Sequence, residues 1–249
     1  MTSIVDILNS AIGQDRVLTG TAIGQQYISD CSRIGAVRPL AVVLPHATSE
    51  VSTVLQVCNQ WGQPVVPQGG MTGLAGGAVA RENDVCLSLE RMRGIEEIDG
   101  AAATMTVLAG TSLQAVHEAA VQQGFEFPVD MGSRGSCQIG GLLATNAGGI
   151  RVIQSGSARE NVLGLEVVLA DGAVLSSMGK MTKNNTGYDL KHWFYWIGGY
   201  PGRNYTRSLK AQAKTIQPAH CPVRAVGLSG DSRTPGRDAN CVRRRTCCV

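Results

Sequence analysis

The apolar residues of the first 194 positions follow two kinds of pattern. Spacings of three and four predict helices, with Ser3 and Thr111 as N-caps and Gly124 after the last helical turn. Short apolar runs bounded by turn residues predict strands, and Asp171-Gly172 between the last two runs predicts a hairpin. The helices are expected over residues 3–13, 48–60 and 111–123, and the strands over 38–45, 64–67, 84–89, 104–109, 162–170 and 173–175.

The order of these elements predicts an α+β protein that starts with a βαβ unit. The helix at 48–60 joins the strands at 38–45 and 64–67, and the second strand leads directly into a glycine-rich segment, residues 68–77. A second glycine-dense segment covers residues 132–149. Both segments are therefore candidates for ligand-binding loops.

The first glycine segment, residues 68–77, is suited to binding an anion. Its glycines let consecutive backbone N–H groups approach a phosphate closely, and the Thr72 hydroxyl adds a donor. A P-loop is excluded because it requires a lysine after its glycines, and no lysine precedes Lys180. The Rossmann fingerprint does not match either, since the loop follows a second strand and has another spacing. A tight loop without a ligand stays the alternative.

The second glycine segment, residues 132–149, combines paired glycines with small polar residues. Thr145 and Asn146 stand between two glycine pairs, and the segment carries few charges. A large cofactor whose pyrophosphate is held without lysine would need walls of this kind. Alternatively, the Asn146 side chain bonds only to local backbone.

Four segments together resemble the FAD-binding domain of the vanillyl-alcohol-oxidase and p-cresol-methylhydroxylase (PCMH) type. The resemblance is to the branch that contains D-lactate dehydrogenase, the glycolate oxidase FAD subunit and D-2-hydroxyglutarate dehydrogenase. It implies a domain of two α/β subdomains over residues 36–194, after an N-terminal helical segment at 1–35, with the family's C-terminal cap domain absent. The segments are Pro64–Ala78, Asp130–Gly149, Asn161–Gly172 and Lys183–Leu190.

The resemblance implies that FAD is bound without a covalent link. Some relatives attach FAD to a histidine of the first glycine loop, where this chain has Met71. The pyrophosphate is expected at residues 68–74 and the isoalloxazine side at 132–149, with Lys183 either near the flavin or in an ordinary polar loop. The implied cofactor-binding residues are Pro67, Gln68, Gly69, Gly70, Met71, Thr72, Gly73, Leu74, Asp130, Ser133, Ser136, Gly140, Gly141, Thr145, Asn146, Gly148, Gly149, Val162 and Lys183.

The implied reaction is the oxidation of a D-2-hydroxy acid, such as D-lactate, glycolate or D-2-hydroxyglutarate, by hydride transfer to the flavin. The sequence identifies no catalytic residue, electron acceptor or oligomeric state. Two alternatives stay open. One is a non-catalytic FAD-binding module or inactive remnant. The other is a UDP-sugar reductase on the same fold, which would need an NADPH site and its own C-terminal domain.

Charge divides the chain at the place where the resemblance ends. The net charge of +3 combines 12 basic and 17 acidic residues before position 195 with 10 basic and 2 acidic residues after it. The net charge is therefore no argument for nucleic-acid binding. The Arg243–Arg245 run and the Cys247-Cys248 pair have no supporting motif, and the four histidines lack co-ligands at metal-binding spacing. No nucleic-acid, lipid or metal site is expected.

The tail, residues 195–249, shows no helical or strand period from residue 200 on, and we expect it to be disordered. A one-base slip explains where it begins. Suitable codons for residues 195–210, read from their second base, translate as IGSEGTLGVITRAVL, which continues the family's sequence. The sequence therefore predicts an extra base near codon 195, a compromised FAD-binding domain and little or no dehydrogenase activity.

The sequence predicts the cellular compartment through two features: its apolar runs and its first six residues. No run approaches 18 apolar residues, and the first six residues lack the basic and apolar parts of a secretory signal. A cytoplasmic protein is expected. The scattered cysteines of the first 194 residues fit buried, reduced thiols, so disulfides are not expected. These cysteines are Cys31, Cys58, Cys86 and Cys137.

Overall fold

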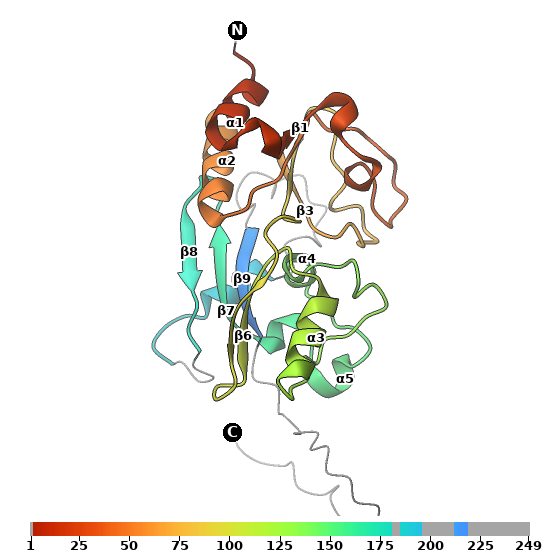
Figure 1. The fold of residues 1–249 in the computed structure, drawn as a ribbon. Coiled ribbons are helices and arrows are strands. Elements are labelled where there is room, and N and C mark those ends of the chain that lie inside the picture. The colour runs from red at the N-terminus through yellow and green to blue at the C-terminus, as the bar shows by residue number, and fades with distance from the viewer. Residues whose placement is uncertain (1, 181–184, 196–211, 219–249) are drawn as a thin grey trace, which may run out of the picture.

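Two β-sheets, each covered by helices, make up the part of the chain that is described (Figure 1). The computed structural model describes residues 2–180, 185–195 and 212–218, the last of these by its backbone. One sheet lies in the upper half of Figure 1 and the other in the lower half. The predicted α+β class with two subdomains is confirmed.

The first sheet contains four strands. They are β1 (Val17–Leu18), β2 (Ala41–Val43), β3 (Val65–Gln68) and β4 (Val85–Ser88). Their order is β1-β2-β4-β3, with β2, β4 and β3 parallel and β1 antiparallel to β2. The apolar runs predicted β2, β3 and β4 correctly. β4 lies between the two strands of the predicted βαβ unit, and its four residues are buried, as a central parallel strand requires.

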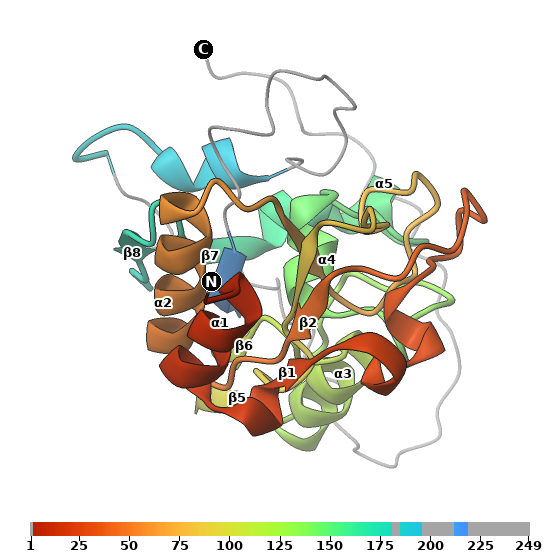
Figure 2. The ribbon, with the colours of Figure 1, turned by 90° about the horizontal axis from the view of Figure 1, so that it is seen from above.

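Two helices, α1 (Ile4–Ile12) and α2 (Thr48–Gln60), cover one face of the first sheet and lie side by side when it is seen from above (Figure 2). Ser3 caps α1 as predicted, since the Asp6 N–H donates to the Ser3 hydroxyl (3.2 Å) and the Ser3 N–H donates to Asp6 Oδ2 (2.9 Å). The apolar sides of both helices pack on the sheet as the first core. Its members include Leu8, Val51, Val54, Leu55, Val85 and Leu87.

The N-terminal segment covers the opposite face of the first sheet. Ile23, Tyr27 and Ile28 pack there against Val42 and Leu44. The segment contains β1 as well as short helices, so its prediction as a helical segment was incomplete. The short helices are the 3-10 turns η1 (Gln14–Arg16), η2 (Gly20–Ala22) and η3 (Gln25–Tyr27).

The second sheet is antiparallel and contains five strands. They are β5 (Ile95–Asp99), β6 (Thr104–Leu108), β7 (Val162–Val168), β8 (Val174–Ser177) and β9 (Gln212–Pro218), in the order β5-β6-β9-β7-β8. The predicted hairpin joins β7 to β8. Gly172 has a φ of +86°, and the Ala173 N–H donates to Asp171 Oδ1 at 2.9 Å.

β9 lies where the sequence pattern predicts no regular structure. It pairs with β6 on one side and with β7 on the other. Its place in the sheet comes from backbone hydrogen bonds to both neighbours, which an apolar pattern along the sequence does not reveal. The prediction of no strand after residue 200 was therefore wrong for Gln212–Pro218. The disorder expected for the rest of the tail stays a prediction.

Helices pack on the second sheet and form the second core. The longest, α3, is capped by Ser112, whose hydroxyl accepts from the Ala115 N–H at 3.2 Å. The predicted cap, Thr111, was wrong, because its buried hydroxyl bonds to the N–H and the carbonyl of Gly94 instead (2.9 Å each). These helices are α3 (Leu113–Gln122), α4 (Ile139–Ala144), η4 (Ala158–Asn161) and η5 (Leu190–Phe194). A further short helix, α5 (Val152–Ser155), has no buried residue.

The two sheets are joined by shared packing. Ala109 and Val168 extend from the second sheet into the first core. The Ser52 hydroxyl of α2 donates to the Gly172 carbonyl in the β7–β8 turn at 2.6 Å. The Thr48 hydroxyl, also in α2, donates to Glu166 of β7 at 3.1 Å. α2 therefore belongs to the first sheet and contacts the second as well.

Three of the four described cysteines are buried, as predicted, but Cys31 is exposed. It lies in an irregular segment outside the cores, which apolar spacing could not reveal. Burial raises the pKa of the Cys86 thiol to about 12 and also raises that of Cys137.

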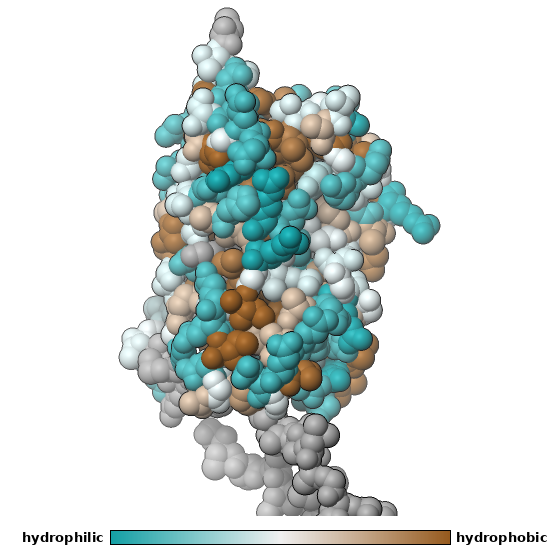
Figure 3. Space-filling model, viewed as in Figure 1, coloured by the Kyte–Doolittle hydropathy of each residue, from teal (hydrophilic) through white to brown (hydrophobic). Residues whose placement is uncertain are grey.

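Figure 3 shows a mainly polar surface over α1 and α2, with apolar residues gathered lower down over the second sheet. Across the described residues, no helix is both long and apolar enough to cross a bilayer.

Candidate cofactor site

The first glycine segment begins where β3 ends. The seven backbone N–H groups of residues 69–75 donate no hydrogen bond to any residue that the structure describes. Within this loop Met71 has a φ of +53°, a left-handed conformation that side chains disfavour. Strained backbone of this kind is common at ligand-binding sites, and a row of unused N–H donors suits an anionic group such as a pyrophosphate.

The second glycine segment lies directly against the first. A Cβ atom placed on Gly70 would stand 1.8 Å from the carbonyl oxygen of Ser136. A Cβ atom on Gly69 would stand 3.5 Å from Gln138 Oε1 and 3.9 Å from the Cα of Gly141. The structure thus brings together the two segments that the sequence assigns to one cofactor.

Several glycines of the second segment are required by packing inside the chain. A Cβ atom on Gly149, whose φ is +73°, would lie 2.1 Å from the Asp130 carbonyl oxygen. On Gly140 it would lie 3.0 Å from the Cβ of Ala109, and on Gly148 2.9 Å from Val152. These three glycines are explained without a ligand, whereas a Cβ atom on Gly141 would meet nothing within 4 Å.

The Asp130 carboxylate faces its own chain. Its Oδ1 lies 3.5 Å from Arg134 Nη1 and 4.0 Å from His117 Nε2. The same imidazole nitrogen lies 2.9 Å from the Val129 carbonyl oxygen, with the ring edge-on to Phe127. These contacts position the backbone that leads into the second glycine segment.

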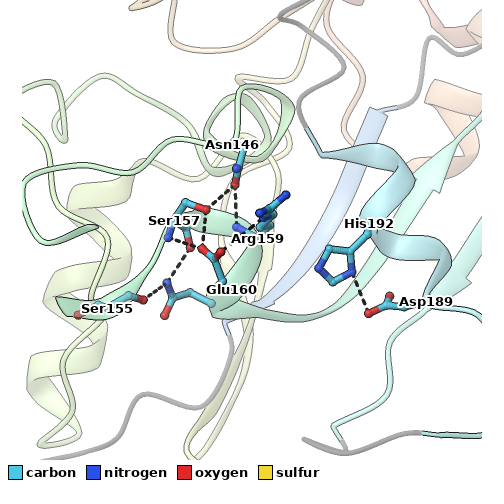
Figure 4. A network of polar contacts seen from close by, with 8 residues as sticks. Asn146, Ser155, Ser157, Arg159, Glu160, Asp189 and His192 are labelled. Atoms are coloured by element: carbon cyan, nitrogen blue, oxygen red, sulfur yellow. Dashed lines mark hydrogen bonds and ion pairs between the residues drawn. The ribbon is translucent and has the colours of Figure 1, made fainter. Parts of the chain in front are cut away.

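Thr145 and Asn146 are bonded locally. The Thr145 hydroxyl donates to the Gly141 carbonyl at 2.9 Å. Asn146 Oδ1 accepts from the Arg159 N–H at 3.1 Å and lies 2.9 Å from the Ser157 hydroxyl (Figure 4). That hydroxyl is also 2.6 Å from a Glu160 carboxylate oxygen and is the main cause that lowers the pKa of Glu160. Asn146 Oδ1 thus bonds to the segment at the start of η4, and a contact of the Asn146 side chain with the flavin stays a prediction.

Replacing Asn146 separates its two contributions to stability. Asn146 has a φ of +48°, and its amide oxygen holds the turn into η4. Asn146→Ala loses the hydrogen bonds and keeps the strained φ, so we expect a loss of about 2 kcal/mol in the free energy of unfolding. Asn146→Gly relieves the φ and should lose about 1 kcal/mol. Urea unfolding measures both; equal losses would show that the backbone conformation contributes nothing.

The remaining predicted residues are divided between the loop and the cores. Thr72 is half-buried and Leu74 is 79 % exposed, both in the first loop. Pro67 pairs with Leu87 inside the first sheet, and Val162 is buried in the second core. Gly73 lies in the first loop, and Gln68 is buried. The Ser133 carbonyl accepts from the N–H groups of Ser136 and Cys137. Lys183 lies outside the described residues.

One segment beside the first loop carried no signal in the sequence. Asp30 Oδ2 lies 3.7 Å from a Cβ position on Gly73, and Ile34 lies 3.0 Å from one on Gly76. Asp30 Oδ2, Gln68 Oε1 and Gln138 Oε1 are buried without a hydrogen-bond donor among the described residues. Two of these acceptors, Asp30 Oδ2 and Gln138 Oε1, lie within 4 Å of Cβ positions on loop glycines. Unused acceptors beside unused N–H donors fit a group with both phosphates and hydroxyls, as FAD has.

Residues 39–177 match the family model described as FAD binding domain. The chain belongs to this FAD-binding family. It is 45% identical over 185 residues to the D-2-hydroxyglutarate dehydrogenase of Xanthomonas citri pv. viticola, covering 74% of this chain and 39% of that protein. It is 44% identical over 158 residues to the mitochondrial D-2-hydroxyglutarate dehydrogenase of Bos taurus, covering 64% of this chain and 29% of that protein. The chain thus spans less than half the length of these relatives.

Solved structures of the same fold support the assignment of the architecture. An alkyldihydroxyacetonephosphate synthase has a TM-score of 0.72 at 18% identity, covering 86% of this chain and 39% of that one. The grass pollen allergen Phl p 4, with glucose dehydrogenase activity, has a TM-score of 0.70 at 20% identity, covering 87% and 43%. At these identities the likeness concerns the fold alone.

Among the described residues, no group of three or more His, Cys, Asp or Glu could hold a metal ion.

Proposed function

We propose that the chain is the cofactor-binding part of an FAD-dependent oxidoreductase that oxidises a D-2-hydroxy acid to the corresponding 2-oxo acid. The observation that carries the proposal is the row of unused N–H groups at residues 69–75, packed against the second glycine segment in a chain of the FAD-binding family. The substrate class rests on relatives named D-2-hydroxyglutarate dehydrogenase. The proposal includes a small hydroxy acid as the substrate, the cytoplasm as the place where the protein acts, and no nucleic-acid partner.

The residues present fit a non-covalently held FAD. The N–H groups of 69–75 and the Thr72 hydroxyl would hold the pyrophosphate, and the unused acceptors Asp30 and Gln138 would bind hydroxyl groups. Gly141 leaves room for a close approach of the cofactor. No histidine stands in the loop for a covalent link, because Met71 occupies the comparable position. When bound, FAD supplies the hydride acceptor.

We also propose that residues 195–249 are translated out of frame. The shifted reading of codons 195–210 supplies the family's continuation, and the same shift through codons 210–214 permits Lys-Leu-Lys-Leu-Lys. This alternation of apolar and charged residues is typical of a strand with one buried face. Its codons overlap Gln212–Pro218, the segment that lies between β6 and β7. The frame-restored chain would thus supply a strand between β6 and β7, where the second sheet already has β9.

The gene with one base removed near codon 195 tests both proposals. We expect the frame-restored protein to purify with bound flavin and to reduce a dye acceptor with D-2-hydroxyglutarate or D-lactate. The present 249-residue chain should show little or no turnover, because the groups that bind the hydroxy-acid carboxylate are expected beyond residue 194. Sequencing the gene is the direct check on the frame.

Three results would contradict these proposals. Equal turnover by the 249-residue chain would refute the proposed loss of the substrate-binding half. A genomic sequence with a single unbroken frame would refute the extra base. Bound flavin without turnover of any D-2-hydroxy acid in the frame-restored protein would favour the non-catalytic module.

A further inference from the structure

The Gln68 side chain links the start of the glycine loop to its end. Gln68 is the last residue of β3, and its carbonyl accepts from the Leu89 N–H at 3.2 Å. Its side chain is 2 % exposed, and its Nε2 donates to the Ala78 carbonyl at 3.0 Å and to the Tyr27 carbonyl at 2.9 Å. One side-chain amide therefore joins both ends of the loop to the N-terminal segment.

We infer that Gln68 is a positioning residue that holds the cofactor loop closed, not a side chain that binds the cofactor. Both Nε2 hydrogens are engaged with backbone carbonyls, so the amide has no donor left for a phosphate. The inference rests on the proposed function, because it is the N–H row of residues 69–75 that the closed loop presents.

The anchor on the N-terminal side is itself fixed. Tyr27 is buried, and its hydroxyl donates to the Glu90 carboxylate. Burial, followed by the hydrogen bond to Glu90, raises the pKa of Tyr27 to about 12, so the hydroxyl remains a donor at neutral pH. Glu90 follows Leu89, the residue whose N–H binds the Gln68 carbonyl. Gln68, Tyr27 and Glu90 thus connect three stretches of chain around the loop entrance.

The loop itself contributes little to its own closure. Residues 69–75 make no backbone donor bonds among the described residues, and the loop-closing Val79 N–H bond to Gly76 lies after them. Without the Gln68 donors, the buried carbonyl of Tyr27 and the half-buried carbonyl of Ala78 would lose their partner, at a cost greater than that of the bonds alone. Gln68 is therefore the contact on which loop closure depends.

The test is Gln68→Glu, which keeps the shape and replaces the two-hydrogen donor by a carboxylate facing two carbonyl oxygens. Amide hydrogen exchange of the cofactor-free 249-residue chain is followed at Ile28, Val79 and Leu89. Near pH 8 we expect exchange to accelerate at least about tenfold at these amides, relative to the unmodified chain at the same pH. Exchange in β2 and in the central residues of β4 should stay unchanged.

The pH dependence distinguishes positioning from simple packing. Burial beside carbonyl oxygens raises the pKa of the introduced carboxyl above its ordinary value, and its protonated form regains one donor. Protection should therefore be partly restored as the pH falls to about 5, and lost as the pH rises through the raised pKa. The matched control is Gln63→Glu, at the other end of β3, since Gln63 Nε2 also donates to two backbone carbonyls, those of Pro64 and Asn83. It should leave the loop amides unchanged.

A titration with FAD, followed by quenching of flavin fluorescence, separates this inference from the proposed function. We expect Gln68→Glu to weaken FAD binding at least about tenfold at pH 8 and less at pH 5. Loop amides that exchange as in the unmodified chain, or that lose protection equally with β2 and β4, would overturn the positioning role. If the unmodified chain binds no FAD while Gln68→Glu still shows the local, pH-dependent loss of protection, cofactor binding by this chain is refuted and the role of Gln68 stands.

Discussion

Gly70→Ala is expected to separate the two glycine segments. The added methyl group would stand 1.8 Å from the Ser136 carbonyl oxygen and 2.7 Å from its carbonyl carbon, so backbone must move. Neither segment can yield by rotating a side chain, because both contacts are with main chain. We expect a loss of at least about 3 kcal/mol in the free energy of unfolding, measured by urea denaturation, and loss of FAD binding.

Gly132→Ala provides the matched control for this substitution. Gly132 lies in the same second segment, and a Cβ atom placed on it meets nothing within 4 Å. Its φ is not positive, so alanine should be tolerated within about 0.5 kcal/mol. If Gly70→Ala were as stable as Gly132→Ala, the direct contact between the two glycine segments would be disproved.

Leu87→Ala is expected to have the largest effect on the first core. Leu87 is fully buried in β4, the strand that pairs with β2 and β3. Truncation of a leucine at such a position leaves a cavity between the first sheet and the helices α1 and α2, and costs about 3–4 kcal/mol. Thermal unfolding should show a Tm lower by roughly 10 °C. Because β3 leads into the first glycine loop, FAD binding should weaken in parallel with stability.

Leu74→Ala makes the same chemical change at an exposed position. Leu74 is 79 % exposed in the first glycine loop. Its truncation should leave the Tm unchanged within about 1 °C, because no buried contact is lost. A comparable fall in Tm for both variants would show that Leu74 packs against something in solution and would contradict the exposed conformation of the loop.

The apolar pattern predicted most elements because burial on one face decides them. β2, β3, β4, β6 and β7 coincide with apolar runs, and α2 with its spacing. β5 was missed, since it carries Glu96 and Glu97 with a register shift between Ile95 and Glu97, and its residues are half-buried or exposed. Strand order was also unreadable, because nothing local shows that β4 lies between β2 and β3.

The site was predictable where glycine marks a backbone contact and less so where a side chain acts through distant partners. Gly69 and Gly70 were found by composition, and the structure places them against residues 136–141. Asp30 and Tyr27 gave no signal, because their closeness to the loop arises only from folding over the first sheet. Gln68 was named from its position, yet its side chain points away from the expected ligand and into the protein.

The contact between Gly70 and Ser136 also has a thermodynamic consequence. Gly70 comes shortly after β3, a strand of the first sheet, and Ser136 precedes Cys137, which is part of the second core. A ligand held between these segments in the native state alone would stabilise both cores together, by about 1.4 kcal/mol for each tenfold excess of free ligand over Kd. The ligand would then add to the packing of Ala109 and Val168 and to the hydrogen bonds of α2 that already join the two sheets, so the two cores should unfold together more cooperatively when the ligand is bound.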